Sequence, residues 1–315
     1  MLHLRLITPA DRTDEVVRLA EKTVGTTHLV VLPGAARNPA GDVVMCDVAR
    51  EAGDELIAGL RRLGIDDTGS IAVENIDLSL SRRADKAEEE APGEGADAVL
   101  WEGLTDATHE ESTLSFTYVA FITLATMIAA CGVVLDNAIL IVGAMAVGPE
   151  FGPLAGVCTA LVRRYPRLAL RSLTALLVGF ALAMAVTVGF TLFMDAIGLF
   201  HRSDLEGKRP NTAFVYAPDA FSFVVAVLAG IAGTLSLTSA KSGLLVGVAI
   251  SVTTVPAAAN AAVALAYGDT AQTLGSTDQL LLNLLGILLA GTLTLLAQKW
   301  LWARQRQRTV RADGF

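Results

Sequence analysis

The sequence predicts a helical membrane protein that crosses the bilayer six times and carries a small α+β domain at its N-terminus. Hydrophobic residues make up 53% of the chain and charged residues 18%, whereas soluble domains average roughly 45–50% and about 25%. The mean hydropathy of +0.53 points the same way. Acidic residues gather in 85–112, which holds ten acids and one base and accounts for the net charge of −8. Because the acids are concentrated in this segment, the net charge does not indicate a surface that binds nucleic acid.

The chain is expected to divide into four parts. These are a ferredoxin-like cytoplasmic domain (1–84), an acidic linker with an entry helix (85–112), a membrane domain (113–303) and a basic cytoplasmic tail (304–315).

Residues 1–84 are expected to follow the order β-α-β-β-α-β of the split βαβ arrangement. Strands are predicted where apolar residues alternate, and helices where they recur every three or four positions. The predicted elements are 2–6, 13–24, 28–32, 42–48, 54–63 and 69–80. The N-terminus lacks the long apolar core of a signal peptide, so we expect this domain to stay in the cytoplasm.

One candidate regulatory site lies in this domain. Pro33 and Gly34 are expected to close the second strand and to open a turn over 35–41, where a small ligand would bind. The alternative is a module that assembles subunits, because a fold does not define a function. His3 and His28 show no partner pattern and are interpreted as ordinary strand histidines.

The linker after this domain is predicted from its composition. Residues 85–95 are acidic and interrupted by proline and glycine, which is typical of a flexible, self-repelling segment. A short helix around Trp101 is then expected at the membrane surface.

Six stretches of the membrane domain are long and apolar enough to cross a bilayer. They are 113–135, 138–162, 172–194, 220–240, 242–268 and 279–298. Buried helices of a soluble protein would show charged faces, and these do not. With both termini inside, ten basic residues face the cytoplasm and three face outward. The sequence therefore predicts a multi-pass protein of the cell membrane with both termini in the cytoplasm.

The two halves of three spans resemble each other, and proline interrupts the second span of each. Pro149, followed by Gly152 and Pro153, lies near the middle of the second span, and Pro256 near the middle of the fifth. Halves with an odd number of spans face opposite ways, so we predict an inverted repeat whose broken helices form a solute site. The alternative is a pair of kinks that only shape the bundle.

Polar residues near these prolines are the candidate ligands of a solute or ion. Glu150 is the only acid well inside a predicted span, where an ionised carboxylate is costly. It is interpreted as a cation site or proton carrier, with a wet cavity or a buried structural pair as the alternative. Thr253, Thr254 and Asn260 are predicted to line the same site.

Two motifs carry a resemblance to a known family: Gly143-Ala144-Met145 followed by Pro149 and Gly152-Pro153, and Gly247 to Pro256. By these motifs the chain resembles the bacterial and archaeal hydrophobic membrane proteins catalogued as domain of unknown function three-eight-nine. The resemblance covers most of the chain and implies an architecture but no activity. Many members have an apolar residue in place of Glu150, so an acid there implies no family-wide role. Many have a second proline in place of Ala257, so the break here is expected to be milder.

The function expected from these features is transport or channel activity for a small solute or ion, with the N-terminal domain sensing a ligand or assembling subunits. A non-transporting membrane receptor or regulator is the first alternative, and a lipid-modifying enzyme the second. The sequence contains no phosphate-binding loop, zinc-protease motif or serine-hydrolase elbow, so no enzyme activity is expected. The odd number and wide spacing of the three cysteines argue against a disulfide framework and a zinc site, and no cofactor is expected.

The expected partners are the lipid bilayer, the solute or ion, and further copies of the chain. Gly148, Gly152 and Gly156 recur at a spacing of four, which lets helices approach closely. A homo-oligomer is therefore expected, with a trimer as the working assumption.

Overall fold

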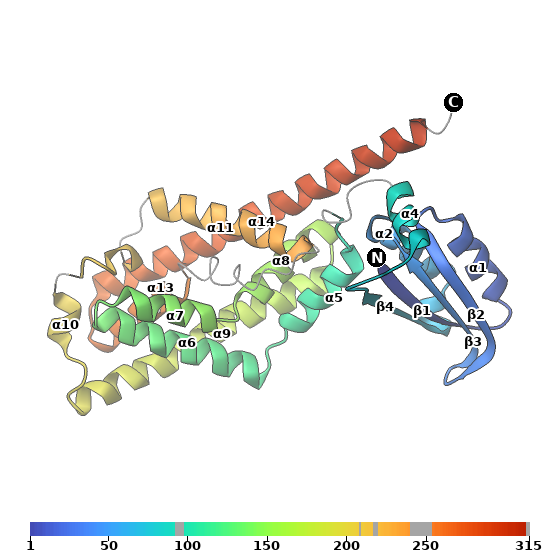
Figure 1. The fold of residues 1–315 in the computed structure, drawn as a ribbon. Coiled ribbons are helices and arrows are strands. Elements are labelled where there is room, and N and C mark those ends of the chain that lie inside the picture. Colours follow the sequence, from blue (N-terminus) through green and yellow to red (C-terminus); the bar gives the residue numbers. More distant parts are fainter. Residues whose placement is uncertain (92–97, 208, 217–219, 240–253, 313–315) are drawn as a thin grey trace. The chain divides into compact units, whose positions relative to one another are not determined.

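Figure 1 shows the fold of the chain in a computed structural model. It describes residues 1–91, 98–207, 209–216, 220–239 and 254–312. The chain divides into two compact units. The N-terminal unit holds 1–103, 238–241 and 300–315, and the second unit, called the membrane unit below, holds 104–237 and 242–299.

The N-terminal unit contains a four-stranded antiparallel sheet in the order β2-β3-β1-β4. Its elements are β1 (Leu2–Thr8), α1 (Thr13–Lys22), β2 (Thr26–Arg37), β3 (Ala40–Val48), α2 (Arg50–Arg62), α3 (Ile65–Thr68) and β4 (Ser70–Asn75). The predicted small α+β domain is therefore confirmed, and its strand order is the one a split βαβ arrangement requires.

The core of this unit follows from the alternation along β1. Leu2, Leu4 and Leu6 are fully or almost fully buried, because successive residues of a strand point to opposite faces. They pack against Leu56 and Leu60 of α2, and α1 contributes to the same cluster. Both helices therefore cover one face of the sheet (Figure 1).

The second strand is longer than predicted, and the expected turn over 35–41 is wrong. β2 continues through Pro33 and Gly34 to Arg37, which pairs with Ala40 of β3. A register shift between Leu32 and Ala36 accommodates the extra residues. A bulge explains this course, because it tolerates a proline that lacks the N–H of a ladder bond.

The start of the predicted flexible linker is helical instead. α4 (Arg82–Glu90) begins after Ser81, whose Oγ accepts a hydrogen bond from the N–H of Ala84 at 3.4 Å. Ala84 and Ala87 are buried, so α4 has an apolar face that the acidic composition concealed. Residues 92–97 lie outside the described residues. The predicted entry helix is present as α5 (Trp101–Glu111).

The second unit is a bundle of apolar helices. In chain order they are α6 (Phe116–Val134), α7 (Ala138–Val147), α8 (Phe151–Arg163), α9 (Pro166–Ala196), α10 (Arg202–Glu206), η2 (Ala213–Val215), α11 (Ala220–Thr238), α13 (Thr254–Ala266) and α14 (Thr270–Ala312). In α6, α9, α11 and residues 270–302 of α14, the helix is long and apolar enough to cross a membrane. The pair α7 and α8, bent by 55°, makes a fifth span if counted as one. These helices indicate a membrane protein.

The fifth predicted span, 242–268, is only partly described. Residues 242–253 lie outside the described residues, and the remainder forms the 13 residues of α13. At about 1.5 Å per residue such a helix extends roughly 20 Å, short of the ~30 Å hydrocarbon core. The described residues therefore give four or five spans, and the total of six spans and the inverted repeat stay predictions.

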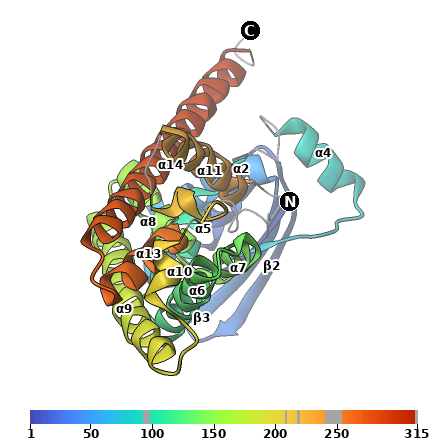
Figure 2. The ribbon, with the colours of Figure 1, turned by 90° about the vertical axis from the view of Figure 1, so that its left-hand side faces the viewer.

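Helix α13 is enclosed by its neighbours. Every residue from Thr254 to Ala264 is buried, and the helix packs chiefly against α6 and α9, with further contacts to α7 (Figure 2). Its sequence is dominated by alanine, which lets neighbouring backbones approach closely.

Candidate functional site: Glu150 at the bend

The bend between α7 and α8 is built by Gly148, Pro149 and Glu150, which lie between the two helices. Proline lacks an amide donor and cannot continue the ladder of α7. The predicted break at Pro149 is therefore confirmed. Gly152 and Pro153 lie in the first turn of α8 instead, where the missing N–H of a proline costs no helical hydrogen bond.

Glu150 projects from this bend into the interior. It occupies the position before the first turn of α8, and only 1% of its surface is exposed. The Thr254 hydroxyl donates a hydrogen bond to Oε1 of Glu150 at 2.9 Å. Because Thr254 precedes Pro256 by two residues, this bond joins the two proline-containing segments, 104 residues apart in the chain.

The chemistry of this contact suits a carboxyl group that changes its charge. An ionised carboxylate only accepts hydrogen bonds, whereas a protonated one also donates. A threonine hydroxyl can donate or accept by rotating, so Thr254 can serve both states of Glu150. An ionised acid at the centre of a membrane helix costs at least ~2.5–3.5 kcal/mol on insertion scales, so an acid there is expected to be protonated, paired or in contact with water.

A second carboxyl group, which the sequence patterns did not indicate, lies against the first turn of α8. A Cβ added at Gly152 would lie 2.5 Å from Cβ of Glu111 and 2.8 Å from its Oε2. The glycine therefore makes room for Glu111, the last residue of α5. Burial of this carboxyl, with a smaller effect of Glu110, raises the pKa of Glu111, although the residue as a whole stays exposed. Because Glu111 is one of many acids in the segment 85–112, the sequence did not single it out.

Tyr118 of α6 adds a polar group to the same region. Its hydroxyl is buried and has no hydrogen-bond partner among the described residues, and its ring packs against Gly179 of α9. Glu150 acts on this hydroxyl electrostatically. Thr254 thus contacts Glu150 directly, Glu111 lies against Gly152, two residues further along the chain, and Tyr118 contributes a buried hydroxyl from α6.

The other predicted site residues fall elsewhere. Asn260 lies six residues beyond Thr254, about 9 Å along α13, and its side chain contacts Arg209 and Ser276. Thr253 lies outside the described residues. Pro256 is fully enclosed in the first described turn of α13. The structure therefore brings Thr254 to Glu150 but places Asn260 in a separate polar cluster.

Pro33 and Gly34, the predicted regulatory site, are exposed in the hairpin. The N–H of Gly34 donates to Oδ1 of Asp42 at 2.8 Å. Nothing lies within 4 Å of a Cβ built at Gly34, whose φ is +62°. The local contacts thus account for a bulge, and ligand binding there stays a prediction.

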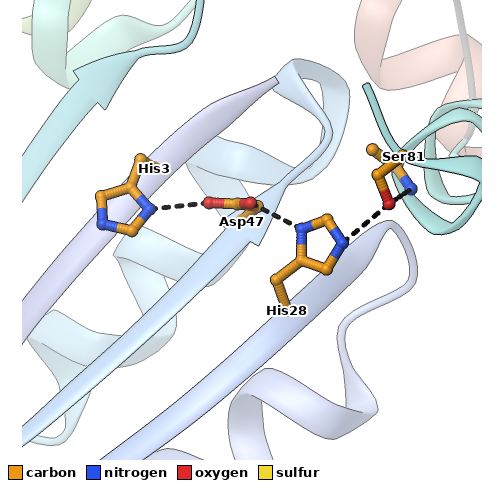
Figure 3. A network of polar contacts seen from close by, with 5 residues as sticks. His3, His28, Asp47 and Ser81 are labelled. Carbon is orange, nitrogen blue, oxygen red and sulfur yellow. Dashed lines mark hydrogen bonds and ion pairs between the residues drawn. The ribbon is translucent and has the colours of Figure 1, made fainter. Parts of the chain in front are cut away.

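The histidines of the N-terminal unit share one carboxylate (Figure 3). Nδ1 of His3 and Nδ1 of His28 each lie 2.7 Å from a different oxygen of Asp47. Nε2 of His28 lies 2.9 Å from Oγ of Ser81, the residue that caps α4. The interpretation of both residues as ordinary strand histidines missed this network, which links three strands to α4. Within the described ranges, no group of three or more His, Cys, Asp or Glu side chains is placed to hold a metal ion.

Comparison with known proteins supports the resemblance. The family model described as Domain of unknown function (DUF389) matches residues 145–289, a range that contains both proline segments. An uncharacterized protein of Methanocaldococcus jannaschii is 25% identical over 202 residues, which cover 64% of this chain and 60% of that relative. No solved structure matches the chain. The match over residues 145–289 confirms the resemblance to this family that the motifs around Pro149 and Pro256 predicted.

Proposed function

We propose that the protein moves a small solute or ion across the cell membrane and that Glu150 binds and releases the coupled proton or cation. One observation carries the proposal: a buried carboxyl group at a helix break, with the hydroxyl of a second proline-containing helix 2.9 Å away. Ionisable groups inside membrane domains typically mark ion or proton pathways. Broken backbone at that depth is tolerated where it faces protein or a cavity.

The neighbouring groups support a route to this carboxyl. Glu111 is exposed yet packs against Gly152, two residues from Glu150. An exposed carboxyl with a raised pKa can take a proton from water near neutral pH more readily than an ordinary one. In the proposed mechanism it delivers protons or cations to Glu150, and the hydroxyls of Thr254 and Tyr118 hold the arriving ion.

The remaining parts of the proposal follow the sequence. Both termini face the cytoplasm, the two broken spans belong to an inverted repeat, and the chain assembles as a homo-oligomer. The N-terminal domain, ferredoxin-like in strand order, senses a cytoplasmic ligand or assembles subunits.

The test uses full-length protein in proteoliposomes that contain a pH-sensitive dye. Gradients of sodium, potassium or lithium chloride are imposed, and the change in internal pH is recorded. We expect a cation-dependent pH change that Glu150→Gln reduces by about tenfold or more, because the amide cannot titrate. The amide still accepts a bond from Thr254, so the variant should fold.

Two matched variants complete the test. Glu110→Gln removes a neighbouring acid of α5 and should leave the flux unchanged, whereas Glu111→Gln should slow it. Cation-dependent thermal unfolding in detergent provides a second readout for each variant. Responses of Glu150→Gln that equal those of the unmodified protein would refute the proposed role of Glu150 and favour a receptor or regulator that transports nothing.

A further inference from the structure

Arg209 is a buried cation at the other polar cluster of the membrane unit. It lies between α10 and η2, and only 4% of its surface is exposed. Nη1 donates to Oδ1 of Asn260 at 2.9 Å, and Nη2 donates to Oε1 of Gln272 at 2.6 Å. The guanidinium lies over the ring of Tyr216, 4.7 Å from its centroid. Its position is thus set by α13, α14 and the loop that precedes α11.

The groups that hold Arg209 are neutral. No carboxylate of the described residues forms an ion pair with it, and its buried Nε has no hydrogen-bond partner there. Asp136 and Asp269 act on it only from a longer distance. A buried charge is costly unless it is paired and hydrogen-bonded, so these contacts leave the charge of Arg209 uncompensated at short range.

The two nearby acids are held by other donors. Oδ1 of Asp136 accepts from the Thr212 hydroxyl at 2.9 Å, and its Oδ2 accepts from Asn211 at 3.0 Å. Oδ1 of Asp269 accepts from the N–H of Gln272 at 3.0 Å, at the start of α14. The two carboxylates are therefore hydrogen-bonded to groups of the loop and of the helix end rather than to Arg209.

The geometry points to a binding site for a small oxyanion, a carboxylate or a phosphate, at Arg209. A guanidinium carries five N–H donors in a planar fork that matches a pair of anionic oxygens. The bonds to Asn260 and Gln272 use two of them, and Nε is enclosed without a partner. Arginine remains charged at any physiological pH, so a bound anion supplies the compensating negative charge that the surrounding residues lack.

This site is independent of the proposed role of Glu150. Arg209 contacts Asn260, whereas Glu150 contacts Thr254, six residues earlier on α13. The oxyanion can come from solution or from a lipid headgroup, and both sources present the same oxygens.

The test measures thermal unfolding of the full-length protein in detergent against rising sodium acetate or inorganic phosphate. Sodium chloride at matched ionic strength is the control for general salt effects. A parallel series adds a short-chain phosphatidylglycerol, so that a lipid source is distinguished from a soluble one. We expect a saturable rise in unfolding temperature in at least one series.

Three variants decide the assignment. Arg209→Gln should raise the half-saturating concentration by about tenfold or more, since it removes a charge-assisted contact. Gln272→Glu places a carboxylate where an amide oxygen lies 2.6 Å from Nη2; it should abolish the response and raise the unfolding temperature in anion-free buffer. Arg202→Gln removes an exposed arginine of α10 and should behave as the unmodified protein.

Several outcomes would overturn the site. These are a saturable response in none of the series, or a response in which Arg209→Gln and Gln272→Glu both match the unmodified protein. If Arg209→Gln does not fold, Gln272→Glu alone tests the site, because it retains the arginine and replaces only the side-chain amide of Gln272 by a carboxylate.

Discussion

The core of the N-terminal unit and the most enclosed described helix of the membrane unit bury side chains of different size. In the N-terminal unit the core is made of large aliphatic residues, with Leu4 and Leu6 of β1 against Leu56 and Leu60 of α2. In the membrane unit the most enclosed helix, α13, buries threonine, alanine, proline, valine and one asparagine from Thr254 to Ala264.

The difference reflects the two solvents. In water, each large apolar side chain removed from the surface stabilises the fold by about 1.5–3 kcal/mol. In lipid there is no comparable gain, and helices associate through close packing and polar contacts. The small residues of α13 thus do more than fill space: they let backbones approach until Thr254 reaches Glu150 and Asn260 reaches Arg209.

Truncation of the leucine core should have the largest effect. Leu4→Ala is expected to lower the free energy of unfolding of the N-terminal unit by about 3 kcal/mol, because it removes a fully buried side chain and leaves a cavity. Hydrogen–deuterium exchange of the β1 and β3 amides in the full-length protein measures this loss. Leu80→Ala, at a position that is 90% exposed, should have almost no effect, and a loss equal to that of Leu4→Ala would contradict the comparison.

Enlargement should be the damaging change in the membrane unit. Ala259→Leu is expected to destabilise the bundle by about 2 kcal/mol, because Ala259 is 0% exposed and the added volume cannot be accommodated without strain. Thermal unfolding in detergent measures the effect. Leu265→Ala on the same helix is the control, since Leu265 is 56% exposed. An Ala259→Leu protein as stable as the control would mean that α13 is loosely packed.

The smallest expected effect is a pH dependence confined to the N-terminal unit. The Thr13 hydroxyl and then the Gly34 N–H hold the pKa of Asp42 below its ordinary value. The unfolded chain therefore binds the proton more readily than the folded one. The stabilisation is complete above the unfolded pKa of about 3.9 and is lost as the pH falls through the lower folded value.

Asp42→Asn should remove this acid sensitivity and leave the membrane unit unaffected. The readout is amide exchange in the β2–β3 hairpin between neutral and acidic pH, corrected for the intrinsic exchange rate at each pH. An unchanged acid response in the variant would assign the sensitivity to another carboxyl group.

Local patterns predicted the elements and the helix break. Alternation identified β1, uninterrupted apolar runs identified the long helices, and Pro149 identified the bend, because each of these signals lies within a few neighbouring residues. Composition misled at α4, where the acidic residues concealed the two buried alanines. The extension of β2 beyond Pro33 depends on its pairing with β3, which no local pattern shows.

The polar contacts likewise divide into those that a local pattern predicted and those that depend on the pairing of distant segments. Glu150 and Thr254 were expected in one site because both adjoin prolines at corresponding places of the two halves. Asp47 lies 44 residues from His3, and its role depends on the register of two strands. Arg209 is one of the three basic residues that are expected to face outward, and an arginine on the side poor in basic residues is a signal that could have singled it out.

The enclosure of α13 has a consequence for how the protein is made. The helices that it contacts most, α6, α7 and α9, precede it in the chain, so they have left the ribosome before Thr254 emerges. The docking of α13 therefore belongs to the late assembly of the bundle. A chain truncated before Thr254 should leave an unfilled groove between α6 and α9, which quality-control proteases can recognise.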